Sequence, residues 1–386
     1  MIVLVDAFVW ASVFIATLGI LQCLAGWVVL RRFAGPSDLP MTVLPPVTLL
    51  KPLCGDEPLL EEALVSSCRQ AYPDFQIVFG VQDPLDPALA IVDRLRDRFP
   101  DLDVTVTIDP TPHGTNRKIS NLMNMMPAAR HDLLVFSDSD LHVAPDYLER
   151  LAVALHQPGV GLVSTLYVGL PSGPSLWQRL GATQISHVFL PGALLARAFG
   201  RQDCLGNTMI LRRETLELAG GLRGLVNELA DDNVLGQRVR HLGLKVTLAD
   251  IVTAVTVPEA SPRAMWLHEI RWARTIRALA PVGFAASAIQ YPIFWASFAL
   301  LLSRAAPWGF ALLGVAWATR AAAAAGIERK LRSRLSRPPA STPAWMLPLR
   351  DFLSIAEIVA SFASNRVVWR GHIFQTGGRT ASRPAE

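Results

Sequence analysis

A long apolar stretch near the amino terminus limits what this chain can fold into. Ala7 to Leu30 contains one strongly polar side chain, Gln22, and is long enough to cross a lipid bilayer as a helix. Arg31 and Arg32 follow directly, whereas no Lys or Arg precedes the stretch, so a cleavable signal peptide is a poor match. The positive-inside rule therefore places the amino terminus outside and the chain after Arg31 on the cytoplasmic side.

The carboxyl-terminal part is apolar as well, and together the two ends explain a hydrophobic content of 51%. Val282 to Leu302 and Trp308 to Ala325 can each span a bilayer. The basic run at 329–337 then lies on the cytoplasmic side, in agreement with the first segment. Three charged residues interrupt the apolar pattern at 344–363, which fits an interfacial amphipathic helix and another span equally well.

Between the apolar ends, strand and helix patterns alternate. A linker with several prolines at 33–46 leads into this region, which covers about residues 45 to 278. Alternating strands and helices are typical of βαβ units and predict an α/β domain with a mainly parallel sheet. The predicted strands in its first half are Val47 to Pro52, Phe75 to Asp83, Asp103 to Ile108 and Leu133 to Phe136.

Acidic side chains follow two of these strands at their carboxyl ends. Asp138 and Asp140 come directly after the fourth strand, and Asp83 ends the second. Ligands of open α/β sheets bind at this edge, where the acids of parallel strands can converge. Asp138 and Asp140 can share a divalent cation that carries phosphate oxygens. The alternative is a turn in which Ser and Asp side chains cap the next helix.

Other signatures narrow the class of protein. The sequence has no G-x-x-x-x-G-K-[ST] loop and no G-x-G-x-x-G that opens a helix after the first strand, which disfavours P-loop enzymes, kinases and dehydrogenases. The four cysteines form no C-x-x-C pair, so neither a zinc site nor a disulfide framework is predicted. The net charge is only +4, and the basic residues gather beside apolar segments. This placement favours an anionic membrane surface over nucleic acid as their binding partner.

Two later segments contain further candidate active-site residues. Asp231 and Asp232 open a predicted helix, where they act either as charged caps or, in a cleft, as a general base for a hydroxyl proton. His268, Arg271 and Trp272 share one side of a helix by their i, i+3, i+4 spacing. They are either interfacial anchors or groups that neutralise a leaving diphosphate.

Short motifs in a fixed order now point to one family. They are Lys51-Pro-Leu, Asp83-Pro-Leu-Asp86, Asn116-Arg-Lys118, Asp138-Ser-Asp140, Ser186-His187, Asp231-Asp232 and Arg271-Trp272. From about Lys51 to Arg277 the chain resembles the ceramide glucosyltransferases of glycosyltransferase family 21 and the bacterial relatives that glycosylate hopanoid lipids. The resemblance implies a GT-A (Rossmann-like) α/β domain with N-terminal and C-terminal transmembrane helices.

The same resemblance implies roles for individual residues. Asp232 falls at the position of the catalytic base, and Asp138 and Asp140 at that of the Mg2+ or Mn2+ ligands. His268 stands where the family has Gln or Arg, and Asp231 where Glu is usual. The nucleotide-sugar site would comprise Lys51, Asp83, Lys118 and Asp138, and the acceptor or diphosphate site His187, Asp231, His268, Arg271 and Trp272.

The function implied is inverting transfer of a sugar from UDP-glucose or UDP-N-acetylglucosamine to a membrane lipid hydroxyl. Ceramide and a hopanoid such as bacteriohopanetetrol are both open as acceptors. The implied location is a bacterial inner membrane, with several membrane segments and a cytoplasmic catalytic domain. A processive polysaccharide synthase shares the fold and is the alternative, although it normally has more membrane spans; a non-enzymatic membrane scaffold is a third reading.

Overall fold

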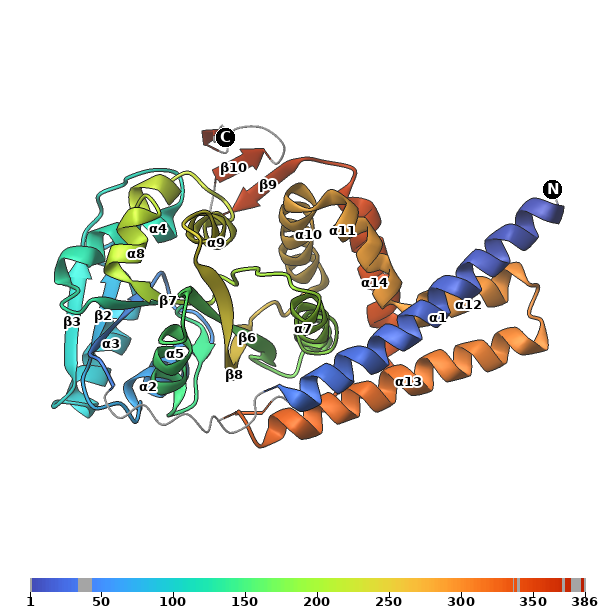
Figure 1. Cartoon of the computed structure of the whole chain (residues 1–386), viewed down its shortest axis with the longest axis horizontal. Coiled ribbons are helices and arrows are strands. Elements are labelled where there is room, and N and C mark those ends of the chain that lie inside the picture. Colours follow the sequence, from blue (N-terminus) through green and yellow to red (C-terminus); the bar gives the residue numbers. More distant parts are fainter. Residues whose placement is uncertain are drawn as a thin grey trace.

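The computed structural model describes residues 2–33, 44–335, 337–338, 341–369, 372–375 and 383–384. Most of the predicted linker, residues 34–43, lies outside this described part. Figure 1 shows an α/β body from which long apolar helices project to one side. This arrangement agrees with the α/β fold and the terminal apolar helices predicted from sequence.

The body is built on an eight-stranded sheet with the order β3-β2-β1-β4-β7-β6-β8-β5. The first four strands along the chain match their predicted positions, and β3, β2, β1 and β4 are parallel. The second half is mixed: β7 runs antiparallel to β4 and β6, β6 pairs with β8 in parallel, and β5 is antiparallel to β8. The strands are β1 Val47–Pro52, β2 Phe75–Val81, β3 Asp103–Ile108, β4 Leu133–Ser137, β5 Leu141–His142, β6 Val160–Pro171, β7 Thr208–Arg212 and β8 Lys245–Val257.

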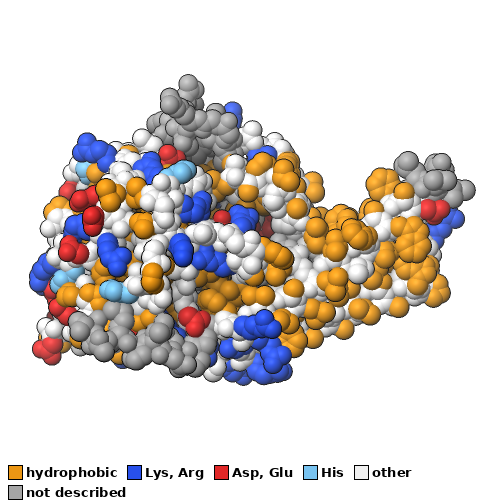
Figure 2. Space-filling view, in the orientation of Figure 1, with side chains coloured by type: hydrophobic (Ala, Val, Ile, Leu, Met, Phe, Trp, Pro, Cys, Tyr) orange, Lys and Arg blue, Asp and Glu red, His pale blue; other side chains and the backbone are white. Residues whose placement is uncertain are grey.

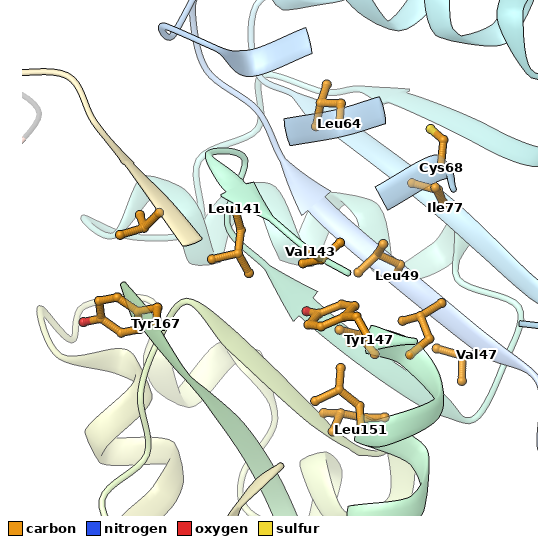
Figure 3. Packing of buried hydrophobic residues seen from close by; sticks show 14 of the residues in the cluster. Val47, Leu49, Leu64, Cys68, Ile77, Leu141, Val143, Tyr147, Leu151 and Tyr167 are labelled. Atoms are coloured by element: carbon orange, nitrogen blue, oxygen red, sulfur yellow. The ribbon is translucent and has the colours of Figure 1, made fainter. Parts of the chain in front are cut away.

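Helices cover both faces of this sheet because the central strands are apolar on both sides. In β4, Val135 joins the core with α2, α3 and α5, whereas Leu134 and Phe136 pack with α4, α8 and α9. Figure 3 shows Tyr147 of α5 beside Leu49 in the first of these layers. The helices of the body are α2 Leu60–Cys68, α3 Ala88–Arg98, α4 Arg117–Met125, α5 Tyr147–Leu155, α6 Leu176–Gln184, the π-helical turn η2 Ile185–Phe189, α7 Leu190–Ala198, α8 Arg213–Leu218, α9 Asp231–His241 and α10 Pro262–Leu279.

Within the described residues, two single helices are long and apolar enough to cross a membrane. They are the segment Val5–Arg32 of α1 (Ile2–Arg32) and α13 (Pro307–Arg332). Both end in basic residues next to the body: Arg31 and Arg32 in α1, and Arg329, Lys330 and Arg332 in α13. Figure 2 shows apolar side chains over the projecting helices and Lys or Arg side chains where they meet the body.

The predicted span from Val282 to Leu302 differs from expectation because it is not one straight helix. It consists of α11 (Pro281–Ala286), the short helix η4 (Ser287–Gln290) and α12 (Pro292–Leu302), with a bend of 72° between Pro281–Gln290 and Pro292–Leu302. Pro292 lacks a backbone N–H, so the helical hydrogen bonds cannot continue through this point. The pair is either a broken span or a re-entrant segment.

The segment predicted as interfacial or spanning forms α14 (Met346–Ser361), which is not one of the two long apolar helices. Its charged side chains are buried against the rest of the protein. Three short strands follow in a small antiparallel sheet: β9 Arg366–Trp369, β10 His372–Gln375 and β11 Arg383–Pro384.

The amino-terminal helix packs directly on the body. Leu30 of α1 and Leu331 of α13 share one apolar cluster with Leu166 of β6 and Leu190 of α7. A Cβ on Gly26 would lie 2.9 Å from the Pro191 Cβ, so α1 reaches α7 this closely only with glycine at this position. The sheet face and the ends of the projecting helices therefore form one core.

Candidate active site

Lys51 lies at the carboxyl end of β1 and contacts the neighbouring strand β4. Its side chain is fully buried, and its Nζ donates to the Ser137 Oγ at 3.0 Å and to the Asp138 carbonyl at 2.7 Å. Burial lowers the pKa of Lys51 to about 8, although the charges of Asp140 and Asp138 oppose this shift. Lys51 thus holds the backbone at Asp138, the first of the two aspartates that follow β4.

Lys118 forms an ion pair with the first of these aspartates. Its Nζ lies 2.5 Å from the Asp138 Oδ1 and donates to the Gly206 carbonyl at 3.2 Å. Burial disfavours the charged amine, but Asp138 and Asp231 outweigh it and raise the pKa of Lys118 above its ordinary range. A permanent cation therefore lies between the end of β4 and the start of α9.

Asp140 faces two other carboxylates. Burial and then the charges of Asp138 and Glu57 raise the pKa of Asp140 to about 8, while Lys51 acts in the opposite direction. Glu57 lies in the loop after β1, and its Oε2 accepts a 2.6 Å hydrogen bond from the Ser139 Oγ. The end of β4 is therefore a site with more negative charge than its lysines neutralise.

Asp231 and Asp232 occupy the first turn of α9, as the sequence predicts. The Asn116 Nδ2 donates to the Asp231 Oδ1 at 3.1 Å, whereas the buried Asp231 Oδ2 has no hydrogen-bond partner among the described residues. Burial and the neighbouring Asp231 raise the pKa of Asp232 to about 7, and burial raises the pKa of Asp231 as well. A Cβ on Gly206 would lie 2.9 Å from the Asp232 Oδ2, so a larger residue in the loop before β7 would displace the Asp232 carboxylate.

These groups come from distant parts of the chain and converge around Tyr167 of β6. Burial raises the pKa of this buried phenol, and the charges of Asp232, Asp138 and Asp140 raise it further. Asp83 lies apart from them: its side chain is exposed after β2, and its Oδ1 accepts from the Leu85 amide at 2.9 Å in a local turn. The acids of β4 and α9 thus share one site, with Asp83 at the rim of the same sheet edge.

His187 lies on the side of the body that meets the membrane helices. It is buried in η2, and its Nε2 is 3.3 Å from the Glu328 Oε1 of α13. Burial lowers the pKa of His187, and its Nδ1 has no partner among the described residues. His187 also lines a small cavity of about 30 Å³ together with Arg179 and Arg332.

The predicted cluster on α10 is present. The His268 Nδ1 hydrogen-bonds Glu259, and the Arg271 Nη2 lies 3.4 Å from the His268 Nε2. The His268 and Trp272 rings meet edge to face at 4.8 Å between centroids. Trp272 also packs against the core cluster that includes Tyr167. The motif on α10 therefore adjoins the sheet layer that contains the acidic site.

Comparison with known proteins assigns this chain to a family. A model described as "Glycosyl transferase family 21" matches residues 8–381, which is nearly the whole chain. The chain belongs to glycosyl transferase family 21. The resemblance stated from the motifs is thereby confirmed.

Relatives of this family 21 chain include ceramide glucosyltransferases. It is 24% identical over 214 residues to ceramide glucosyltransferase 1 of Caenorhabditis elegans and 27% identical over 234 residues to that of Komagataella phaffii. Each match covers 54% of this chain and 45% of the relative, so the chain spans about half the length of the relatives it matches.

A solved structure shares the fold of the family 21 chain. It is a mannosyltransferase from Pyrobaculum calidifontis, in complex with GDP-Man and Mn2+, with a TM-score of 0.52 and 22% sequence identity. The similarity covers 93% of this chain and 99% of that one. The predicted GT-A fold is confirmed by this likeness.

The acids of the family 21 site suit a metal held jointly with a substrate. Within the described residues, no three His, Cys, Asp or Glu side chains form a group that could hold a metal ion by themselves. Mg2+ is commonly held by one or two carboxylates together with substrate phosphates, and the crowded carboxylates at Asp138 and Asp140 are of this kind. A divalent cation would also relieve the repulsion that raises the pKa of Asp140.

Glu57 and Tyr167 are parts of the site that motif reasoning did not select. Glu57 follows the carboxyl end of β1, so the rule that identified Asp83 could have identified it too. Tyr167 gave no comparable signal because it lies within a long apolar strand. Asn116, which lies in one of the motifs, proves to bridge α4 and Asp231.

Proposed function

We propose that this protein is an inverting glycosyltransferase that moves a sugar from UDP-glucose or UDP-N-acetylglucosamine to a hydroxyl of a membrane lipid. Ceramide or a hopanoid such as bacteriohopanetetrol would be the acceptor. The catalytic part, residues 45–278, would lie on the cytoplasmic side of a bacterial inner membrane. Residues 1–32 and 281–326 would anchor it, and residues 327–386 would add a basic loop, an interfacial or membrane helix and a cytoplasmic tail.

The observation that carries this proposal is the meeting of two groups of carboxylates around Lys118. Asp138 pairs with Lys118 at 2.5 Å, and Asp232 and Asp231 lie close enough to Lys118 to affect its pKa. Displacement of a diphosphate requires cationic groups near the leaving group and a base near the attacking hydroxyl. A site with both, in a body that packs against two helices apolar enough to cross a membrane, suits a lipid acceptor that cannot leave the bilayer cheaply.

In the proposed reaction Asp232 accepts the proton of the lipid hydroxyl as its oxygen attacks the anomeric carbon. The bond from that carbon to the donor phosphate breaks, the diphosphate takes the electron pair, and the configuration inverts. A pKa of Asp232 near 7 suits a base that works near neutral pH. Lys118 holds negative charge beside the leaving group, and Asp231, held by Asn116, keeps the pKa of Asp232 high.

Asp140, with Asp138, would hold the divalent cation. Such a cation, Mg2+ or Mn2+, would neutralise charge on the departing diphosphate. Lys51 fixes the backbone of Asp138 and so keeps both carboxylates in place. The donor's nucleoside would lie toward the Asp83 rim, and His268, Arg271 and Trp272 would border the acceptor or diphosphate.

The function is tested by product analysis. Membranes containing the chain are incubated with UDP-glucose, UDP-N-acetylglucosamine or GDP-mannose, each with ceramide or bacteriohopanetetrol, and the lipids are examined by mass spectrometry. We expect a lipid carrying one added hexose or N-acetylhexosamine from a UDP-sugar. A long polymer would instead identify a processive synthase, and the absence of any sugar product would contradict the proposal.

We predict that Asp140→Asn makes donor binding less dependent on the metal. Asparagine keeps an oxygen ligand but removes the charge, so Mn2+-dependent UDP binding should weaken by roughly tenfold or more. Isothermal titration with UDP, with and without Mn2+, measures this change. Asp132→Asn is the matched control, because the side chain of Asp132 is 94% exposed at the opposite end of β4. Equal metal dependence in Asp140→Asn and wild type would remove Asp140 from the metal site.

A further inference from the structure

α14 distributes its side chains in the opposite way from a surface helix of a soluble protein. Trp345, Leu349, Phe352 and Val359 are exposed, and Val359 is 67% exposed. Their spacing, together with exposed Ala356, places them on a single stripe of the helix. The outward face is therefore apolar.

The charged side chains of α14 point the other way and are paired inside the protein. Arg350 is fully buried, and its Nη1 donates to both carboxylate oxygens of Glu269 on α10 at 3.0 and 2.9 Å. Its Nη2 donates to both oxygens of Glu357 at 2.7 and 2.8 Å, and its Nε donates to the Ser354 Oγ at 3.0 Å. No water is needed to satisfy this guanidinium.

The remaining acid of α14 is satisfied in the same manner. The Asp351 Oδ1 lies 2.8 Å from the Arg320 Nη2 of α13, and its Oδ2 accepts from the Ile293 amide of α12 at 3.2 Å. Ionisable groups within a bilayer almost always face the protein interior and pair with one another. Arg350, Asp351 and Glu357 meet this requirement.

The outward stripe continues an apolar surface that the membrane helices begin. The Phe352 ring lies 5.1 Å from the Phe294 ring of α12, and Phe362, just after α14, lies 6.3 Å from Phe284 of α11. α11 and α12 belong to the bent pair that is apolar enough to enter a membrane. Monomeric soluble proteins rarely expose such a continuous apolar area to water.

We propose that α14 is embedded in the acyl-chain region of the membrane, in the leaflet next to the body, without crossing the bilayer. The partner of its outward stripe is lipid acyl chain. Its 16 residues extend about 24 Å, less than the roughly 30 Å hydrocarbon core. The chain after it also stays at the body, because Arg277 and Arg274 of α10 donate to the carbonyls of Ser364 and Arg366 at 2.9 and 2.8 Å.

This location has a consequence for α10. Because Arg350 joins α14 to Glu269, the helix that carries His268, Arg271 and Trp272 lies at the lipid boundary. A lipid headgroup beside α14 would then lie next to the helix whose Trp272 packs against the core cluster that includes Tyr167. The inference itself depends on the location of α14 and stands apart from the sugar-transfer reaction.

Spin-label accessibility tests the proposal on the full chain in phosphatidylcholine vesicles. Nitroxide labels are attached to Phe352→Cys and Val359→Cys, and to Leu218→Cys on α8 as the control, since Leu218 is 64% exposed on the body. All three carry Cys23→Ala and Cys54→Ser, which remove the half-buried and the exposed native thiols. Collision with oxygen, which concentrates in lipid, is compared with collision with a water-soluble nickel complex.

We expect the ratio of oxygen to nickel collisions to be several-fold higher at 352 and 359 than at 218. Nickel access at 352 and 359 equal to that at 218 would place the stripe in water and overturn the proposal. Low collision with both reagents would mean that protein, either a second copy or another chain, covers α14, and would overturn it as well. Unchanged thermal unfolding of the labelled variants shows that each label leaves the fold intact.

Discussion

Asp232→Asn is expected to abolish sugar transfer while UDP still binds. The variant keeps the shape of the side chain but cannot accept the hydroxyl proton, and removal of a general base costs about 10²–10⁴-fold in rate. Binding should survive because Lys118 still pairs with Asp138 at 2.5 Å. Initial rates of lipid glycosylation and titration with UDP in the presence of Mn2+ measure the two effects separately.

The matched control for this variant is Glu214→Gln. Glu214 is also an acid in the first turn of a helix, α8, but it is exposed and follows Arg213, whose amide donates to the Asp132 carbonyl at the opposite end of β4 from Asp138. Its rate should stay within about twofold of wild type, as expected of a surface charge. A fully active Asp232→Asn would remove Asp232 as the base and leave the mechanism without a proton acceptor.

Arg350→Leu is expected to cause the largest loss of stability. The substitution leaves Glu269 and Glu357 facing each other without their shared cation, and both are nearly buried, with 11% and 7% of their side chains exposed. Breaking a buried ion pair by removing one partner typically costs about 3–5 kcal/mol. Thermal unfolding of the detergent-solubilised chain should show a clearly lower midpoint.

Two further variants separate charge from packing in this prediction. Arg94→Leu removes an ion pair to Glu61 in which both side chains are about half exposed, so about 1 kcal/mol or less should be lost. Adding Glu269→Gln and Glu357→Gln to Arg350→Leu removes the unpaired charges and should restore part of the midpoint. If Arg350→Leu unfolds like Arg94→Leu, the buried network does not stabilise the fold.

The strands and their acids could be predicted because they depend on local patterns. An apolar run such as Leu133 to Phe136 defines a buried strand by itself, and the acids that follow it must lie at its carboxyl end. The pairing of Asp138 with Lys118 depends on two separate segments, and only the family motifs linked them beforehand. Glu57 could have been selected by the rule that identified Asp83, because it follows the carboxyl end of β1, but its hydrogen bond with Ser139, 82 positions away, could not be predicted.

The membrane part was harder to predict for a physical reason. Arg350, Asp351 and Glu357 interrupt an apolar sequence, and sequence alone does not say whether such charges face water or protein. The answer lies in partners on α10 and α13, Glu269 and Arg320, which no local pattern connects to α14. The bend before Pro292 could have been predicted from the sequence, because proline interrupts a helix.

Because α1 packs closely against α7 at Gly26, the amino-terminal helix is part of the body and is not a flexibly linked anchor. A domain joined to its anchor by a flexible linker samples many heights above a bilayer, whereas this α/β body is held at a single height. The distance from the lipid surface to Asp232 is then constant. Acceptors would be sorted by how far their hydroxyl rises out of the membrane, before any contact with the sugar is made.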